Sequence, residues 1–372
     1  MRKILILSKK AVHPLNDGRS VRIYETSKSL FPEDDITILS LSDKSSQNRL
    51  DERVREICLF DSVTSLLAVE AEKTWSDKES FLRATMKEKR FWEFEKIARN
   101  DTFLSVAKIL IEQSDVVVFE ELETAYTVMS EDVSELLLSK DFIYSAHNVE
   151  ADFMSEDWRR VYDKSFSSME IKIASMFPTI HTCTEQDAEY FKKYTEASVV
   201  CLPNTAKQSS TISEEERQRN KKMLFGAEGV CLSFIGSSHP PNSESLSFII
   251  EELCPSFPDI TFVVVGSSGY TAKEEYKDMD IIPDNCLILG YLANGLKDFV
   301  LQSSDAMINP VFSGSGANIK VMDAIRNGIP LITTEFGIRG YQAQKNITKH
   351  VSENTRSDFV DVLRAFTDSQ PD

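Results

Sequence analysis

The chain has 372 residues, of which 41% are hydrophobic and 9% aromatic, enough for two packed domains with separate cores. Its 59 acidic and 42 basic residues give a formal net charge of -17, so a nucleic acid would be repelled and is excluded as a partner. No apolar run is long enough to span a bilayer, and the apolar part of MRKILILSKK is too short for a signal peptide. The 6 cysteines are irregularly spaced, which favours free thiols in a reducing cytoplasm over disulfides or a zinc site.

Short β-branched runs alternate with longer amphipathic segments along the first half of the chain. The expected strands are 3–7, 35–41, 55–59, 115–119, 142–146, 179–183 and 198–202. The expected helices include 20–30, 103–112 and 184–194, the last with Thr184 and Asp187 spaced as in a capping box. This alternation predicts a parallel sheet that is covered on both faces.

The composition changes after Pro203 and Asn204. Residues 205–229 are polar, contain EEERQRNKK, and predict a linker followed by a solvated helix. Alternation then resumes, with expected strands at 230–235, 260–265, 286–289, 306–309 and 331–334. Three of these strands are followed at once by Gly236, Gly266 or Gly290. A second parallel sheet is therefore expected, with its ligand crevice at the carboxyl ends of the strands.

The stretch SGSGANIKVMDAIRNGIPLITTEFGIRGY, residues 313–341, predicts a loop, a helix and a strand in succession. The two glycines of SGSG allow tight or left-handed backbone, so consecutive N–H groups can point at a bound anion. We expect the helix to begin near Ala317, with its positive dipole end beside that anion. Lys320 and Asp323 would follow on one face and would suit a diphosphate and a ribose. An ordinary loop, helix and strand unit of an α/β core is the alternative.

Nine motifs occur in a fixed order along nearly the whole chain. In the first half they are HPLNDGRSVRIYETSKSL, SAHNVEADF, CTEQDAEYF and CLPN. In the second half they are LSFIGSSHPPNSESLSFI, FVVVGSSG, LILGYL, SSDAMINPVFSGSGANIKVMDAIRNGIPLITT and FGIRGY. Together they resemble the retaining GT-B glycosyltransferases of family 4, also called glycosyl transferases group 1, in the branch with a glycine-rich loop.

This resemblance implies an α/β fold of GT-B type, in which two Rossmann-like domains face each other across a cleft. The acceptor-side domain would span 1–204 and the nucleotide-sugar-binding domain 205–356, with a helix at 357–370 packing back on the first domain. The implied reaction moves a hexose from a UDP- or GDP-type sugar to a glycan, lipid-linked or protein acceptor. The anomeric configuration would be retained, as in polysaccharide biosynthesis, and no metal or other cofactor is expected.

The resemblance also assigns roles to residues. His147 and Lys320 would be catalytic, with His147 near the transferred sugar and Lys320 near the diphosphate. The acceptor side would include Arg22, Asn148 and Glu150. The donor would be bound by Gly18, Gly236, Ser237, Ser313, Gly314, Ser315, Gly316, Ala317, Asn318 and Asp323.

The chain departs from the family pattern in three places. A family glutamate eight residues before Asp323 is replaced by Ser315, and a second family glutamate is Asp323 itself. An Arg-Lys pair that clamps the diphosphate is not found after Gly236, where the chain reads SSHPPNSES. Lys320, the N–H groups of the glycine-rich loop and Arg326 would then neutralise the phosphates.

These departures leave other functions open. One alternative is a catalytically inactive GT-B accessory or binding subunit of a glycosylation complex. Another is an epimerase or hydrolase acting on a nucleotide sugar, although the carboxylate and histidine constellation that it needs is not found.

Two charged segments have several interpretations. Asp278 and Asp280 form a DxD pattern that could hold a divalent cation, but we interpret them, like Asp34 and Asp35, as solvated surface. Residues 81–99 carry six basic and three acidic side chains, with Phe91, Trp92 and Phe94 interleaved. Such a helix could contact an anionic membrane or a lipid-phosphate acceptor, or simply pack its rings into the domain. We therefore expect a cytoplasmic protein, with a peripheral position at the inner face of the membrane as the alternative.

Overall fold

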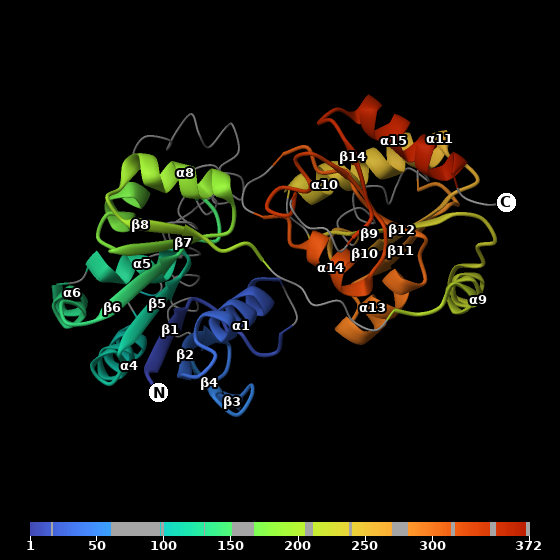
Figure 1. The fold of residues 1–372 in the computed structure, drawn as a ribbon. Coiled ribbons are helices and arrows are strands. Elements are labelled where there is room, and N and C mark those ends of the chain that lie inside the picture. Colours follow the sequence, from blue (N-terminus) through green and yellow to red (C-terminus); the bar gives the residue numbers. More distant parts are fainter. Residues whose placement is uncertain are drawn as a thin grey trace, which may run out of the picture. The chain divides into compact units, whose positions relative to one another are not determined.

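The computed structural model describes residues 1–15, 18–60, 97, 100–129, 131–150, 167–204, 211–237, 240–269, 282–313, 317–342 and 347–369. The chain divides into two compact units, Met1–Pro203 and Asn204–Asp372, and each unit has its own sheet (Figure 1). The division falls one residue before the end of the domain predicted to span 1–204.

The N-terminal unit contains an eight-stranded sheet in the order β3-β4-β2-β1-β5-β6-β7-β8. The strands are β1 (Lys3–Ser8), β2 (Asp35–Ser42), β3 (Ser46–Arg49), β4 (Val54–Phe60), β5 (Val116–Glu120), β6 (Asp141–Ser145), β7 (Thr179–Thr182) and β8 (Ser198–Cys201). All neighbouring pairs are parallel except β3 and β4, which are antiparallel. The sequence did not predict β3, because its residues SQNR are polar and mostly exposed at the edge of the sheet.

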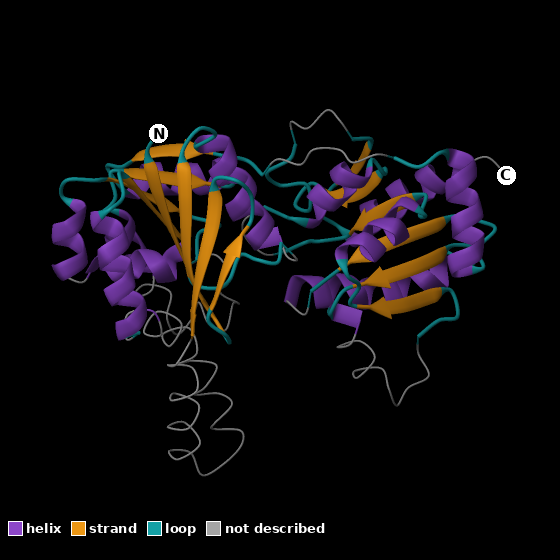
Figure 2. Cartoon of the chain, turned by 90° about the horizontal axis from the view of Figure 1, so that it is seen from below, coloured by secondary structure: helices purple, strands orange, loops and turns teal. Residues whose placement is uncertain are grey.

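Helices cover both faces of this sheet (Figure 2). They are α1 (Gly18–Leu30), α4 (Asp101–Glu112), α5 (Glu121–Ala125), the 3-10 turn η1 (Tyr126–Met129), α6 (Glu131–Leu137) and α8 (Glu185–Tyr194). Alternate residues of β1 point to opposite faces: Leu5 packs in the cluster with Phe103 and Phe191, and Ile4 packs in the cluster with Ile23 of α1. The doubly covered parallel sheet predicted from strand and helix alternation is confirmed.

The predicted cap of α8 is also confirmed. The Thr184 side chain accepts a hydrogen bond from the Asp187 backbone N–H at 3.1 Å. This bond satisfies one of the first N–H groups of the helix, which have no partner within it.

The C-terminal unit contains a six-stranded, fully parallel sheet in the order β11-β10-β9-β12-β13-β14. Its strands are β9 (Cys231–Ile235), β10 (Thr261–Val265), β11 (Cys286–Gly290), β12 (Ala306–Asn309), β13 (Leu331–Thr334) and β14 (Lys349–Ser352). Its helices are α9 (Glu214–Phe225), α10 (Pro240–Phe248), the π-helical turn η2 (Ile249–Leu253), α11 (Cys254–Ser256), α13 (Asn294–Gln302), α14 (Lys320–Asn327) and α15 (Arg356–Asp368). The sequence did not predict the edge strand β14, because KHVS has no long β-branched run.

The C-terminal helix α15 packs within the C-terminal unit. Its Phe359, Leu363 and Phe366 are buried in one cluster with Phe248 of α10 and Ile332 of β13. The expectation that this helix returns to the first domain is therefore wrong. Its apolar stripe packs on α10 and on the sheet of its own unit, and Figure 1 shows α15 in that unit.

Strand order reverses at one point in each sheet. In the N-terminal unit β1 lies between β2 and β5, and in the C-terminal unit β9 lies between β10 and β12. Loops leave the sheet in opposite directions at such a point, which opens a crevice at the carboxyl ends of the strands. The candidate sites are therefore expected where β1 meets β5 and where β9 meets β12.

A buried ion pair anchors α9, which the sequence predicts to be solvated. Lys221 Nζ lies 2.9 Å from Asp305 Oδ2, and both side chains are buried. The same Oδ2 accepts the backbone N–H of Cys231 at 2.7 Å. One carboxylate thus joins α9 to the start of β9 and to the residue that precedes β12.

We expect Asp305→Ala to lower the free energy of unfolding by about 3–5 kcal/mol, because it leaves the buried Lys221 ammonium and the Cys231 N–H without an acceptor. The double variant Asp305→Asn with Lys221→Met keeps an acceptor for Cys231 and removes the charge, so most of that loss should be recovered. Urea denaturation of the three proteins checks this. Equal stability of Asp305→Ala and the parent protein would contradict the anchoring role.

Candidate functional site

Two glycine loops cross at the switch point of the C-terminal unit. A Cβ on Gly236, after β9, would lie 2.5 Å from Ser268 Oγ. A Cβ on Gly266, after β10, would lie 2.2 Å from the Gly236 carbonyl oxygen, and its φ of +107° is one that L side chains rarely adopt. Only glycine permits this approach, so the backbones of the two loops lie in direct contact at the carboxyl ends of β9 and β10.

Lys320 is the first residue of α14 and lies at this switch point, three residues after the predicted start of the helix at Ala317. Its Nζ donates to Asn242 Oδ1 at 2.6 Å and sits 4.6 Å from the centroid of the Phe234 ring. The residue is only 9% exposed. Asn242 is held in turn by donating to the Ser237 carbonyl oxygen at 3.1 Å and to Ser237 Oγ at 3.0 Å.

Burial lowers the pKa of Lys320 to about 7, and the charge of Asp323 opposes this only in part. The cause is that a neutral amide and an aromatic face replace little of the hydration of an ammonium. Near neutral pH this lysine is therefore close to half protonated. A bound anion would favour the charged form.

The segment on either side of the glycine-rich loop is held by polar contacts. Ser313 Oγ donates to Glu244 Oε2 at 2.9 Å, and Asn318 Nδ2 donates to Asn309 Oδ1 at 3.2 Å. The predicted anion-binding residues Gly314, Ser315 and Gly316 lie outside the described residues. The described contacts therefore fix the two ends of the loop at the carboxyl end of β12 and at α10.

Asp323 points toward α13 rather than toward Lys320. Its Oδ1 lies 2.6 Å from Lys297 Nζ, with side chains 16% and 17% exposed. Asn327 further links the helices by donating to Asp298 and accepting from Gln302, each at 3.1 Å. The ion pair is thus not the sole polar link between α13 and α14, and it stays partly open to solvent. The sequence analysis missed Lys297, because no periodicity marks which helical lysine faces a neighbouring helix.

The predicted catalytic histidine lies at the carboxyl edge of the N-terminal sheet, one strand away from the switch point. His147 follows β6, and its Nε2 lies 2.7 Å from Oε2 of Glu120, the last residue of β5. The two side chains are 11% and 4% exposed. Arg22 of α1 is buried, and its Nη1 donates to the Leu202 carbonyl oxygen at 3.2 Å.

Glu120 is held as a carboxylate. Burial alone would raise the pKa of Glu120, but the hydrogen bond and attraction from His147 and the charge of Arg22 more than offset it, so the pKa lies below its usual value. Arg22, predicted on the acceptor side, therefore lies where it compensates this buried charge.

An ionic cluster follows Glu120 directly. Glu121 has a φ of +69°, a strained conformation for a residue with a side chain. Its carboxylate lies 3.2 Å from Lys9 Nζ and 3.5 Å from Arg19 Nη1, and Lys9 also lies 2.8 Å from Glu123. The sequence analysis missed these residues, although two acidic residues directly after the predicted strand 115–119 were a usable signal.

The other predicted residues of this unit contact one another. Asn148 Nδ2 donates to Glu150 Oε1 at 2.7 Å, and the Glu150 N–H donates to Glu170 Oε1 at 2.8 Å. These bonds fold the segment after His147 back on itself. Gly18 is the first residue of α1.

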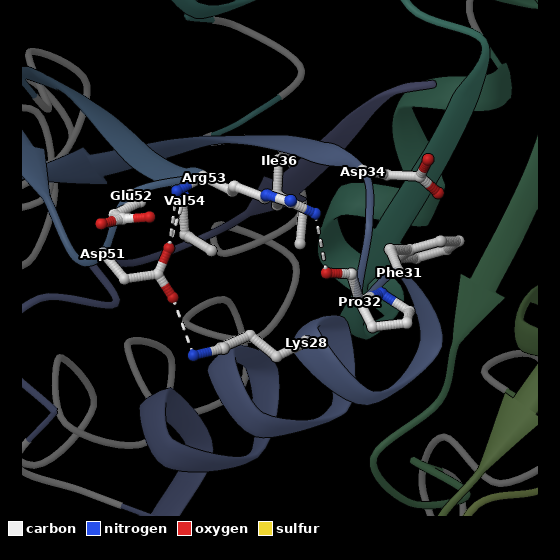
Figure 3. Close-up of a pocket in the computed structure, with 9 residues that line it drawn as sticks. All are labelled: Lys28, Phe31, Pro32, Asp34, Ile36, Asp51, Glu52, Arg53 and Val54. Carbon is white, nitrogen blue, oxygen red and sulfur yellow. Dashed lines mark hydrogen bonds and ion pairs between the residues drawn. The ribbon is translucent and has the colours of Figure 1, made fainter. Parts of the chain in front are cut away.

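A cavity of about 300 Å³ lies at the opposite edge of the N-terminal sheet, where strands begin (Figure 3). Its lining includes Lys28, whose Nζ reaches Asp51 at 2.8 Å, and Arg53, which donates to the Pro32 carbonyl oxygen at 3.2 Å. Asp34 at its rim is buried and paired with Arg2 at 2.7 Å, so it is not the solvated surface residue expected from the sequence. Lys28, Asp34, Asp51 and Arg53 already have ion-pair partners, and ligands of parallel sheets bind at the carboxyl edge, so we do not assign function to this cavity.

Two expectations fall outside the described residues almost entirely. Asp278 and Asp280 lie outside the described residues, as does the basic aromatic segment 81–99 apart from Ile97. Within the described ranges no group of three metal-ligating side chains occurs. In the same ranges, no helix combines the length and apolar character that crossing a bilayer requires.

Part of the chain matches a known protein family. Residues 230–367 match the family described as Glycosyl transferases group 1. No curated protein sequence matches the chain significantly. The C-terminal part of the chain is therefore similar to glycosyl transferases of group 1, and the chain has the GT-B fold, as the motifs predicted.

Solved structures share the whole architecture at low identity. Sucrose-phosphate synthase from Thermosynechococcus elongatus has a TM-score of 0.74 and 9% identity, covering 99% of this chain and 90% of that one. HepE from Anabaena, in complex with UDP and glucose, has a TM-score of 0.67 and 10% identity over 99% and 90%. Starch Synthase IV from Arabidopsis thaliana, bound to ADP and acarbose, has a TM-score of 0.65 and 13% identity over 100% and 92%. At such identities the likeness shows the fold.

We expect the binding of a diphosphate to take up a proton at Lys320. At a pH of about 8 most of this lysine is neutral, because its pKa is about 7, and a bound diphosphate requires the ammonium form. Calorimetric titration with UDP, GDP and pyrophosphate in buffers of different ionisation enthalpy should show uptake of up to one proton. Affinity should weaken by up to about tenfold for each further pH unit. Lys320→Met should abolish the uptake, and equal uptake by both proteins would rule out this site.

Proposed function

We propose that the chain transfers a hexose from a UDP- or GDP-type nucleotide sugar to a hydroxyl of a glycan, lipid-linked or protein acceptor, with retention of anomeric configuration. The observation that carries this proposal is the buried Lys320 beside the glycine crossing, in the unit that matches the glycosyltransferase family. The complexes of HepE with UDP and glucose and of Starch Synthase IV with ADP support a nucleotide donor.

The chemistry requires stabilisation of a departing nucleoside diphosphate. Negative charge develops on the leaving phosphate as the bond to the sugar breaks, so a cation that is already in place lowers the barrier. Lys320 has little hydration left to lose, because it is buried before the donor arrives. The start of α14 adds a positive dipole end at the same place. We propose that this combination serves without a metal ion.

We propose that Asp323 accepts a ribose hydroxyl of the donor. Its carboxylate has a second oxygen beyond the one paired with Lys297, and the pair is partly open. A carboxylate held by one lysine can accept a further hydrogen bond without moving. Lys297 would then hold the Asp323 carboxylate in place for the ribose hydroxyl.

We propose that the acceptor binds at the carboxyl edge of the N-terminal sheet. The polar residues gathered there include His147, Asn148 and Glu150 from the segment after β6. Arg22 contributes through the charge of Glu120. These charged side chains are paired, but they can still donate and accept hydrogen bonds, which suits an acceptor substrate rich in hydroxyl groups.

Donor turnover tests the proposal and separates it from an inactive accessory subunit. We expect purified protein to release UDP or GDP from a nucleotide sugar, and Lys320→Ala to lower kcat/KM by about 100-fold or more, because one preorganised donor to the leaving group is lost. Lys222→Ala is the matched control, since Lys222 is an exposed lysine of the same unit that is paired with Glu228. Full activity of Lys320→Ala would contradict the phosphate role.

Nucleotide binding measured by thermal shift distinguishes a binding subunit from an enzyme. A nucleotide at about 100 times its Kd should add about 2.7 kcal/mol of apparent stability. Stabilisation without turnover of any donor would favour the accessory subunit. If nucleotides neither stabilise the protein nor are turned over, the nucleotide site is unsupported.

The ribose contact is tested with 2′-deoxynucleotides. We expect the parent protein to bind UDP or GDP about 10- to 100-fold more tightly than the 2′-deoxy form, and Asp323→Asn to narrow this ratio, because a hydrogen bond to a carboxylate is weakened. Lys297→Met keeps the carboxylate and should keep the preference. If Asp323 only joins α13 to α14, both variants lose stability while the ratio stays unchanged.

A further inference from the structure

The contact between Glu120 and His147 is set by the sheet. In the register of β5 and β6, Glu120 lies opposite Ser145, and His147 follows two residues later. Both side chains therefore leave adjacent strands at the same edge. The 2.7 Å distance between Nε2 and Oε2 is a consequence of strand pairing rather than of two mobile loops.

The neighbouring side chains that act most strongly on Glu120 favour its carboxylate form. His147 and the Ser145 side chain hydrogen-bond to it, and Arg22 adds a positive charge. The charge of Glu120 also acts on His181 of β7, where it raises the pKa and so opposes the lowering caused by burial. An ionised carboxylate can only accept hydrogen bonds, so the His147 nitrogen that faces it must carry the hydrogen.

We propose that Glu120 is a positioning residue that holds His147 in the Nε2–H tautomer, leaving Nδ1 as the acceptor for a hydroxyl of the bound sugar. In a neutral imidazole one nitrogen donates and the other accepts, so fixing one fixes both. Within the described part of the chain no group forms a hydrogen bond with Nδ1. This proposal rests on the proposed transferase function for its substrate.

The same arrangement selects the kind of group that His147 can bind. An Nδ1 lone pair attracts a hydroxyl, which can donate, and repels an ionised phosphate, which can only accept. The carboxylate of Glu120 behind the ring strengthens this preference. Anion binding thus falls to Lys320 in the C-terminal unit, and hydroxyl recognition falls to His147 in the N-terminal unit.

The tautomer can be measured directly. We expect the full chain labelled with ¹⁵N-histidine, at a pH of about 8 where ordinary imidazoles are neutral, to show His147 with a protonated Nε2 and an unprotonated Nδ1 in long-range ¹H–¹⁵N spectra. The resonance is assigned by its loss in His147→Gln. An Nδ1–H tautomer in the parent protein would overturn the proposal without any variant.

Glu120→Gln tests whether the Glu120 carboxylate is what fixes the tautomer of His147. The amide is close in shape to the carboxylate, and its oxygen is drawn to the Arg22 charge and the Ser145 hydroxyl, so its NH₂ group should face His147. We expect His147 to switch to the Nδ1–H tautomer and kcat to fall by about 10- to 100-fold, with a smaller change in the KM for the donor. Glu121→Gln is the matched control, since Glu121 pairs with Lys9 and Arg19 instead and should leave the tautomer unchanged.

Three outcomes would overturn the positioning role. They are an unchanged tautomer in Glu120→Gln, a switch of the tautomer without loss of kcat, and an equal switch in the Glu121→Gln control. Failure of the proposed function is seen separately, as the absence of turnover by the parent protein with every nucleotide sugar tried. The tautomer of the parent protein and its response to Glu120→Gln remain readable in that case.

Discussion

Parallel strand pairing is the constraint on which the rest of this protein depends. All strands of the C-terminal sheet, and all but β3 in the N-terminal sheet, run the same way, so the residues that follow them gather at one edge. The reversal of strand order beside β1 and beside β9 then fixes where at that edge a ligand can enter. His147 and Lys320 lie far apart in sequence and in different units, yet each follows from the same rule.

The two edges differ in how they treat charge. At the N-terminal edge the carboxylates of Glu120 and Glu121 are compensated by Arg22, Lys9 and Arg19. At the C-terminal edge Lys320 is buried against an aromatic ring and a neutral amide, and no carboxylate of the described residues is in direct contact with it. The first edge is electrostatically satisfied before a ligand binds, whereas the second is satisfied only when an anion arrives. This contrast agrees with a neutral polyol on one unit and a diphosphate on the other.

Much of this architecture could be predicted from the sequence, because it depends on local periodicity. The strands around Leu5 and Val263 and the cap at Thr184 follow from alternation and from a short hydrogen bond within one turn. Strands β3 and β14 could not be predicted, since their residues lack an apolar pattern and pair only because a sheet edge is available.

The candidate site was predictable only in part, because local sequence patterns do not show which residues tertiary packing brings together. His147 and Lys320 stand in motifs that resemble a family, and the family match covers residues 230–367. Their partners Glu120 and Asn242 come from β5 and α10, and only tertiary packing brings them within 2.7 Å and 2.6 Å of the two residues. The buried Lys221 is a similar case, because nothing in EEERQRNKK distinguishes it from the exposed lysine beside it.

The packing of α15 within its own unit has consequences for how the chain folds during synthesis and for how it can recombine in evolution. Each unit is one uninterrupted stretch, and the polypeptide passes from the first to the second only once, after Pro203. A stretch that closes its own core can be completed on the ribosome without waiting for the other, and the N-terminal one is finished first. The same contiguity makes the C-terminal unit a self-contained module, which recombination can exchange for another in a single event.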